Sequence, residues 1–327
     1  MLLQMDGSLP NLALMRIASH CQKRGDSVDF RWEREYAPDL FHKTDQIYAS
    51  LIFERTRPHA KRLLSMFPDA IVGGTGWDIT KTLESVGITE PGPDYRIYPK
   101  ESRSVGFTQR GCRLKCPFCV VPKKEGAMTE AGTIADIWRG EPFPKDIVLL
   151  DNDFFGQSRW RERIDEIREG EFRVSLSQGI NARFLTKETA EAVASIDYFD
   201  TSFKRRTLYT AWDNRKDEAR LVRGLRCLID AGVPPSRIMV YMLIGYWPGE
   251  TDEDWEHRRR TLRDLGVDPY PMPFVRTPET VGFQRFVCGH YDKRIPWDRW
   301  KAAKFRPRNL DGERPLLTTP PPESEER

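Results

Sequence analysis

The chain of 327 residues has no long hydrophobic run, and no apolar segment approaches the roughly 20 residues that span a bilayer. Its first residues, Met1 to Gly7, lack the basic and apolar regions of a secretory signal peptide. We therefore expect a cytoplasmic protein with no membrane partner, in a compartment that keeps thiols reduced.

The chain also lacks a strong charge of either sign and any internal repeat. Its 52 basic and 49 acidic residues leave a net charge of +3, which is too small to argue for a nucleic-acid partner and does not exclude one. Hydrophobic residues make up 39% and charged residues 31%, as is typical of a globular protein with a substantial core.

Cysteine is too sparse for a disulfide framework, since six cysteines are spread over the whole chain. Three of them, Cys112, Cys116 and Cys119, nevertheless lie within eight residues. The other three are isolated in the sequence: Cys21, Cys227 and Cys288. The distribution favours a metal site in the cluster over covalent cross-links.

The first ninety residues alternate between short apolar runs and helical stretches. We expect strands at 1–5, 27–32, 46–53 and 69–72, and helices at 11–24 and 57–67. This alternation predicts a small α/β domain with a parallel sheet over residues 1–90, followed by a linker at Glu90-Pro91-Gly92-Pro93.

From residue 104 the alternation becomes longer and more regular. Six strands are expected, at 105–109, 147–150, 172–176, 198–202, 238–244 and 268–275. The helices between them include one capped by Thr186 and one that begins with a capping-box pattern at Thr251 and Asp254. The spacing predicts a partial (β/α)6 TIM-like barrel with a C-terminal helical extension over 104–305, because a closed eight-stranded barrel usually needs about 250 residues. The segment 306–327, rich in Pro, Glu and Ser, is expected to be disordered.

The cysteine cluster has the spacing C-x3-C-x2-C and follows directly on the first of these six strands. Iron–sulfur clusters are normally held by four thiolates, so a loop with three leaves one iron open for chemistry. A structural zinc knuckle is the alternative, but it requires a fourth ligand from a distant part of the chain.

This motif, with Phe118 before its last cysteine, resembles the signature of the radical S-adenosylmethionine (SAM) superfamily. The resemblance implies a 4Fe–4S cluster on Cys112, Cys116 and Cys119 and SAM bound at its open iron. It implies reductive cleavage of SAM into methionine and a 5′-deoxyadenosyl radical, which abstracts hydrogen from a substrate that the sequence does not identify. It also implies a low-potential electron donor of the flavodoxin or ferredoxin type.

Ligand sites on such barrels gather at the carboxyl ends of the strands. By resemblance Phe118 would pack near adenine, and the turn after the second strand would meet the methionyl group, although Asp151-Asn152 departs from the Gly-Gly-Glu-like segment of the family. The predicted SAM contacts are Phe118, Asp151, Asn152, Gln178, Ser202 and Gly245.

The amino-terminal region resembles a short cobalamin-binding-like Rossmann domain. It has no Asp-x-His-x-x-Gly loop, so no cobalamin is expected. Methylthiotransferases of the superfamily carry three further cysteines in this region, where the chain has only Cys21. Three interpretations stay open: a radical SAM enzyme, a non-catalytic iron–sulfur protein that senses redox state or oxygen, and an atypical methylthiotransferase-like enzyme acting on nucleic acid.

Overall fold

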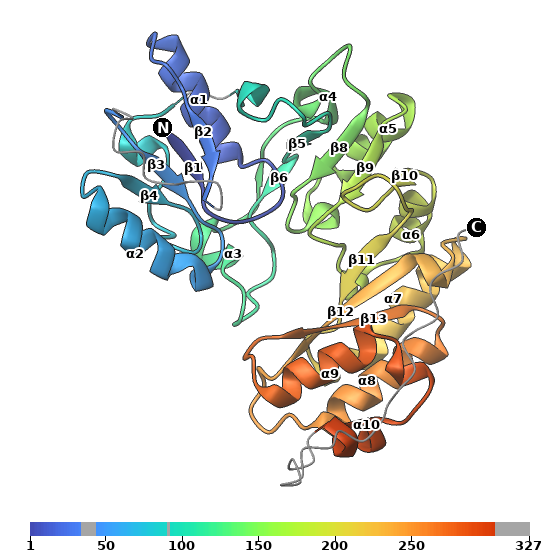
Figure 1. Ribbon diagram of the computed structural model, residues 1–327. Coiled ribbons are helices and arrows are strands. Elements are labelled where there is room, and N and C mark those ends of the chain that lie inside the picture. Colours follow the sequence, from blue (N-terminus) through green and yellow to red (C-terminus); the bar gives the residue numbers. More distant parts are fainter. Residues whose placement is uncertain (34–43, 90–91, 305–327) are drawn as a thin grey trace, which may run out of the picture. The chain divides into compact units, whose positions relative to one another are not determined.

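The computed structural model describes residues 1–33, 44–89 and 92–304 (Figure 1). The chain divides into two compact units, of which the first comprises Met1–Thr210 and Val222–Pro234 and the second Ala211–Leu221 and the residues from Pro235 on. The first unit thus continues past the domain boundary that the sequence suggests at 90–104. Glu90 and Pro91 of the expected linker, and the expected disordered tail at 306–327, lie outside the described residues.

The first unit begins with a four-stranded sheet whose order is β2-β1-β3-β4 and whose strands are all parallel. Its strands are β1 (Leu2–Gln4), β2 (Phe30–Trp32), β3 (Tyr48–Ser50) and β4 (Ile71–Gly73). Two helices accompany it, α1 (Leu12–Lys23) and α2 (Arg57–Met66). Each of these elements overlaps a predicted one.

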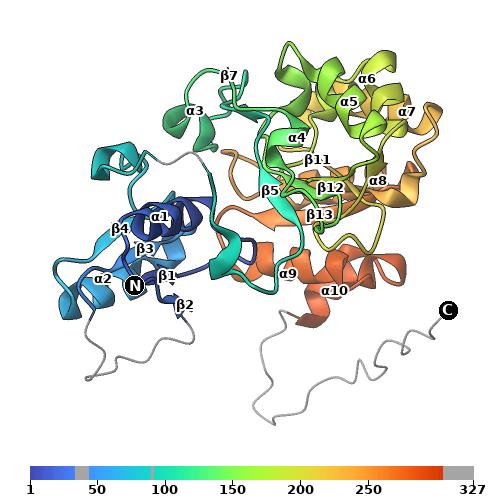
Figure 2. The ribbon, with the colours of Figure 1, turned by 90° about the horizontal axis from the view of Figure 1, so that it is seen from above.

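The helices cover opposite faces of this sheet (Figures 1 and 2). Leu2 belongs to the buried cluster that contains Leu14 of α1, whereas Leu3 belongs to the cluster that contains Leu63 of α2. Successive side chains of a strand point to opposite faces, so the apolar run at the start of the chain serves both layers.

A second parallel sheet of the same unit has the order β10-β9-β8-β5. Its strands are β5 (Ser104–Gly106), β8 (Asp146–Leu149), β9 (Arg173–Leu176) and β10 (Asp197–Tyr198). The helices between them are α4 (Ile134–Ile137), α5 (Trp160–Glu169) and α6 (Lys187–Ala194). Thr186 caps α6 with a hydrogen bond from the Thr189 N–H, as the sequence predicts.

The second unit is entered through β11 (Leu208–Ala211) and α7 (Glu218–Asp230), each of which has residues in both units. Its other elements are β12 (Ile238–Ile244), α8 (Asp252–Asp264), β13 (Asp268–Pro273), α9 (Pro278–Cys288) and α10 (Trp297–Lys304). The strand order is β11-β12-β13, with β12 and β13 parallel. Alternate residues of β13 are prolines, which an edge strand tolerates because their missing N–H groups all face away from the ladder.

The prediction of an α/β fold with parallel sheets is confirmed. Four strand ends were predicted wrongly by two residues or more: β3 ends at Ser50 instead of 53, β5 at Gly106 instead of 109, β10 at Tyr198 instead of 202, and β13 at Pro273 instead of 275. The chain turns after β10 because the Asp200 carboxylate accepts hydrogen bonds from the Ser202 and Lys204 N–H groups. Among the residues that the structure describes, none of the helices has the length and apolar character needed to cross a membrane.

Candidate functional site

The three clustered cysteines lie on one loop, residues 111–120, here called the cysteine loop. It follows β6 (Gln109–Arg110), which pairs in antiparallel fashion with β7 (Thr129–Glu130), and it leads into α3 (Val121–Lys124). Within the loop, the Cys119 N–H donates to the Cys116 carbonyl oxygen at 3.0 Å. The Leu114 N–H donates to the Cys112 sulfur at 3.4 Å, so a backbone hydrogen bond holds this sulfur atom in the loop.

All three thiols are partly buried. Burial is the main cause that raises the pKa of Cys112, and the negative charges of Asp153, Cys116 and Cys119 raise it further. Cys116 and Cys119 therefore lie close enough to Cys112 to influence its ionisation. In the described part of the chain, however, no three His, Cys, Asp or Glu side chains are grouped closely enough to hold a metal ion. The donors suit a sulfur-ligated centre in kind, and a 4Fe–4S cluster binds each thiolate to a different iron, so its ligands need not converge on one point as those of a single metal ion do.

The start of the loop is anchored by Asp151, which follows β8 and is only 4% exposed. Its carboxylate accepts hydrogen bonds from the Thr108 N–H at 2.8 Å, the Gln109 N–H at 3.2 Å and the Thr108 hydroxyl. The carboxylate that the sequence assigns to SAM thus binds the backbone that leads into the cysteine loop.

Glu125 ties the other end of the loop to the same strand end. Its carboxylate accepts from the Arg110 guanidinium at 2.8 Å, the Gly111 N–H at 2.9 Å and the Asn152 side-chain amide at 3.0 Å. Burial acts to raise the pKa of Glu125, but these bonds to Arg110 and Gly111 hold it below its usual value. Asn152, a second predicted SAM contact, therefore braces the loop as well.

A third carboxylate, that of Asp153, lies beside the first cysteine. Its Oδ2 atom is 4.0 Å from the Cys112 sulfur and 2.9 Å from Nε of Arg113. Burial raises the pKa of Asp153, and Arg113 opposes this. Neither Asp153 nor Glu125 was singled out from the sequence. The acidic run at 151–153 was the one available signal, while the partners of Glu125 lie 14 to 27 residues away.

The other predicted contacts are distributed over several strand ends. Phe118 is partly buried on the cysteine loop itself, and Gln178 is exposed in the turn after β9. Ser202 is exposed after β10, where its hydroxyl donates to Asp200 at 2.7 Å. Because β8, β9 and β10 are parallel neighbours, their carboxyl ends share one edge of the second sheet.

Gly245 belongs to the second unit and directly follows β12. Its φ of +73° suits glycine, and its N–H donates to the Glu250 carboxylate at 2.8 Å. Glu250, from the Pro-Gly-Glu-Thr segment, thus fixes the end of the strand on which Gly245 lies.

Comparison with protein-family models and with curated proteins yields no match to this chain.

Asp151 gives the site a measurable pH dependence. Burial raises the pKa of its carboxyl group from 3.8 to about 6, although the bonds from Thr108 and Gln109 partly offset this. A carboxyl group whose pKa is higher in the folded state costs stability once it ionises, so the cost is absent below its unfolded pKa and complete above about pH 6. Relative to Asp151→Asn, the wild type should lose up to about 3 kcal/mol of unfolding free energy between about pH 4 and about pH 7. Urea unfolding of both proteins across this range is the measurement, and a difference independent of pH would contradict the prediction.

Two glycines offer a matched test of how tightly the loop is packed. Gly111 and Gly126 have φ values of +76° and +72°, but a Cβ at Gly111 would lie 2.4 Å from the Ala127 carbonyl oxygen, whereas one at Gly126 would meet nothing within 4 Å. Both alanine substitutions incur the strain of a left-handed backbone, about 1 kcal/mol. We expect Gly111→Ala to lower the free energy of unfolding by about 1–3 kcal/mol more than Gly126→Ala. Equal losses in denaturant titrations would show that the loop start is not closely packed.

Proposed function

We propose that the chain is a radical SAM enzyme that acts on an unidentified substrate and binds a 4Fe–4S cluster through Cys112, Cys116 and Cys119. The observation that carries this proposal is that one loop holds three thiols and is fastened at its base by Asp151 and Glu125. Because no fourth cysteine is near in the sequence, one iron would have no thiolate ligand from this chain and would be open to SAM.

When bound, the cluster would supply the electron that splits SAM into methionine and a 5′-deoxyadenosyl radical able to abstract hydrogen from the substrate. The chain's own residues would set the geometry. Asp151 and Asn152 would hold the two ends of the cysteine loop at the end of β8, and Arg113 would keep the Asp153 charge paired beside Cys112.

The proposed fold is the partial (β/α)6 TIM-like barrel over 104–305, preceded by a small Rossmann-like domain over 1–90. It is supported by the parallel pairing of β5, β8, β9 and β10 in chain order, by the parallel pair β12 and β13, and by the helices between the strands. In such a barrel the SAM contacts would be Phe118, Asp151, Asn152, Gln178, Ser202 and Gly245.

The reaction would need a low-potential electron donor of the flavodoxin or ferredoxin type, and the proposed location is the cytoplasm. Cobalamin is not part of the proposal. An iron–sulfur redox or oxygen sensor, and a methylthiotransferase-like enzyme acting on nucleic acid, are outcomes that the experiments below distinguish.

The proposal is tested first by the number of irons that the protein binds. Anaerobically reconstituted protein should hold about four irons per chain with the spectrum of one cubane cluster. A variant with Cys21, Cys227 and Cys288 all replaced by Ser should hold the same amount. Burial, with the charges of Asp268 and Asp292, raises the pKa of Cys288 to about 11, which disfavours a thiolate there. A parent protein with about eight irons, of which this variant loses four, would instead reveal a second cluster and favour the methylthiotransferase-like interpretation.

The contact of SAM with the β9 end is tested by Gln178→Ala. The side chain is exposed without SAM, so the substitution should not affect folding. If Gln178 hydrogen-bonds SAM, the variant should bind it more weakly by about 1–3 kcal/mol. Isothermal titration of the reconstituted protein with SAM measures this, and an unchanged affinity would remove Gln178 from the proposed site.

A further inference from the structure

The Asp153 carboxylate has a fixed place beside the first cysteine of the loop. Its side chain is only 3% exposed, and its Oδ2 atom lies 4.0 Å from the Cys112 sulfur. Gly156 makes room for it, because a Cβ there would clash with the Asp153 carboxylate and would lie 3.0 Å from the Met128 sulfur. The Gly156 N–H also donates to the Asp153 carbonyl oxygen at 2.8 Å. Packing and a backbone turn therefore hold this negative charge next to Cys112.

Arg113 balances the charge of Asp153 only in part. Its Nε atom lies 2.9 Å from Asp153 Oδ2, and its Nη2 atom donates to Oδ1 at 3.3 Å. The guanidinium lies over the Phe184 ring, 5.0 Å from the centroid, and the Arg113 side chain is 38% exposed. Water and salt screen an exposed charge more than a buried one. The buried carboxylate therefore dominates the electrostatic field at the Cys112 sulfur.

The reduction potential of an iron–sulfur cluster depends on the net charge around it and on hydrogen bonds to its sulfur ligands. A negative charge beside a cysteine ligand disfavours the addition of an electron, so it lowers the potential. The Leu114 N–H, which donates to the Cys112 sulfur at 3.4 Å, acts in the opposite sense but is only a dipole. The full charge of Asp153 is the larger of the two effects.

We propose that Asp153, held in place by Arg113, is a positioning residue that lowers the reduction potential of the cluster on Cys112, Cys116 and Cys119. The inference rests on the proposed function, because it requires that cluster. A lower potential makes the reduced cluster a stronger reductant towards SAM. The acidic side chain after β8 thus acts on the electron that the cluster delivers, through the cysteine that it faces.

The test is a potentiometric titration of the reconstituted protein without SAM, followed by electron paramagnetic resonance, at about pH 9, where carboxyl groups are ionised. In Asp153→Asn the ratio of reduced to oxidised cluster at a given applied potential should rise about tenfold. For one electron this is a shift of about 59 mV to more positive potential. Arg113→Gln leaves the carboxylate unopposed and should shift the potential in the negative direction.

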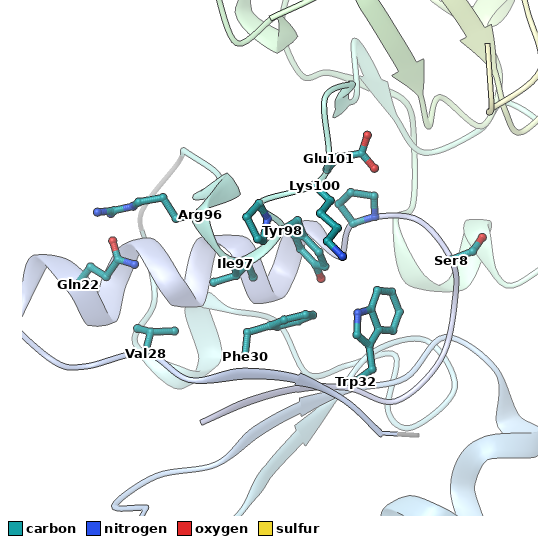
Figure 3. A pocket seen from close by; sticks show the side chains of 12 residues that line it. Ser8, Gln22, Val28, Phe30, Trp32, Arg96, Ile97, Tyr98, Lys100 and Glu101 are labelled. Carbon is teal, nitrogen blue, oxygen red and sulfur yellow. The ribbon is translucent and has the colours of Figure 1, made fainter. Parts of the chain in front are cut away.

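Asp94→Asn is the matched control. The Asp94 side chain is 8% exposed and pairs at 3.0 Å with Arg96, whose side chain is largely exposed, so the pair resembles Asp153 with Arg113. Arg96 lines an open cavity of about 670 Å³, and no residue of the cysteine loop is among the described residues that line it (Figure 3). The same change of one buried charge should here leave the cluster potential at the wild-type value.

The outcomes separate this inference from the function on which it rests. A wild type that binds no cluster would overturn both. A cluster whose potential in Asp153→Asn is no more positive than in Asp94→Asn would overturn the role of Asp153 alone. If Asp153→Asn does not retain the cluster, Arg113→Gln decides, and an unchanged or more positive potential in that variant would overturn the inference. Circular dichroism checks that the variants are folded.

Discussion

Replacement of any one of Cys112, Cys116 and Cys119 with Ala is expected to remove the cluster completely. A cubane cluster on this loop has three protein ligands, so one missing thiolate leaves a second iron without a ligand from the chain. We expect the iron content of the reconstituted variants to fall from about four to near zero, with loss of the visible absorption of the cluster.

The same substitutions should leave the fold intact, because the three side chains are only partly buried and the loop is fastened through other residues. The Cys21→Ser protein is the matched control, and its iron content should equal that of the wild type. Full iron retention after any one of the three loop substitutions would contradict the ligand assignment, as would zinc in place of iron.

Replacement of Arg258 with Met is expected to produce the largest loss of stability. The guanidinium lies in α8, is fully buried, pairs with Glu250, and donates to the Trp212 and Leu243 carbonyl oxygens at 2.9 Å each. Burial lowers the pKa of Arg258, and the charge of Glu250 opposes this. Removal of one member of a buried ion pair leaves an uncompensated charge, so we expect a loss of about 3–5 kcal/mol in the free energy of unfolding.

Arg260→Met is the control for this prediction, because Arg260 pairs with Glu256 on the same helix but its side chain is 63% exposed. It should cost no more than about 1 kcal/mol. The double substitution Arg258→Met with Glu250→Gln should recover part of the loss, since it removes both charges. Urea unfolding of the four proteins makes the comparison, and equal losses for Arg258→Met and Arg260→Met would contradict the assigned role of Arg258.

The sequence predicts the fold well where the signal is local. The strand at 238–244 has the predicted bounds because its seven residues are a continuous apolar run, and the helix after it begins at the predicted capping box of Thr251 and Asp254. The failures lie where side chains redirect the backbone. Asp200 turns the chain before Ser202, and β11 is a four-residue strand next to a basic run that gave no strand signal.

The candidate site, like the fold, could be predicted from the sequence only where the pattern is local. The spacing of the cysteines is a local pattern and can be found without a structure. The contacts that fasten the loop join residues far apart in the chain, such as Asp151 with Thr108 and Asn152 with Glu125. No periodicity encodes such pairs. They also give Asp151 and Asn152 partners within the protein that the sequence could not reveal.

The central claim is most directly tested by whether the reconstituted protein cleaves SAM. Under anaerobic conditions with a low-potential reductant, we predict that the wild type forms 5′-deoxyadenosine, measured by chromatography, and that Cys116→Ala forms none. A wild-type protein that holds about four irons yet forms no 5′-deoxyadenosine would contradict the claim and favour a non-catalytic iron–sulfur protein.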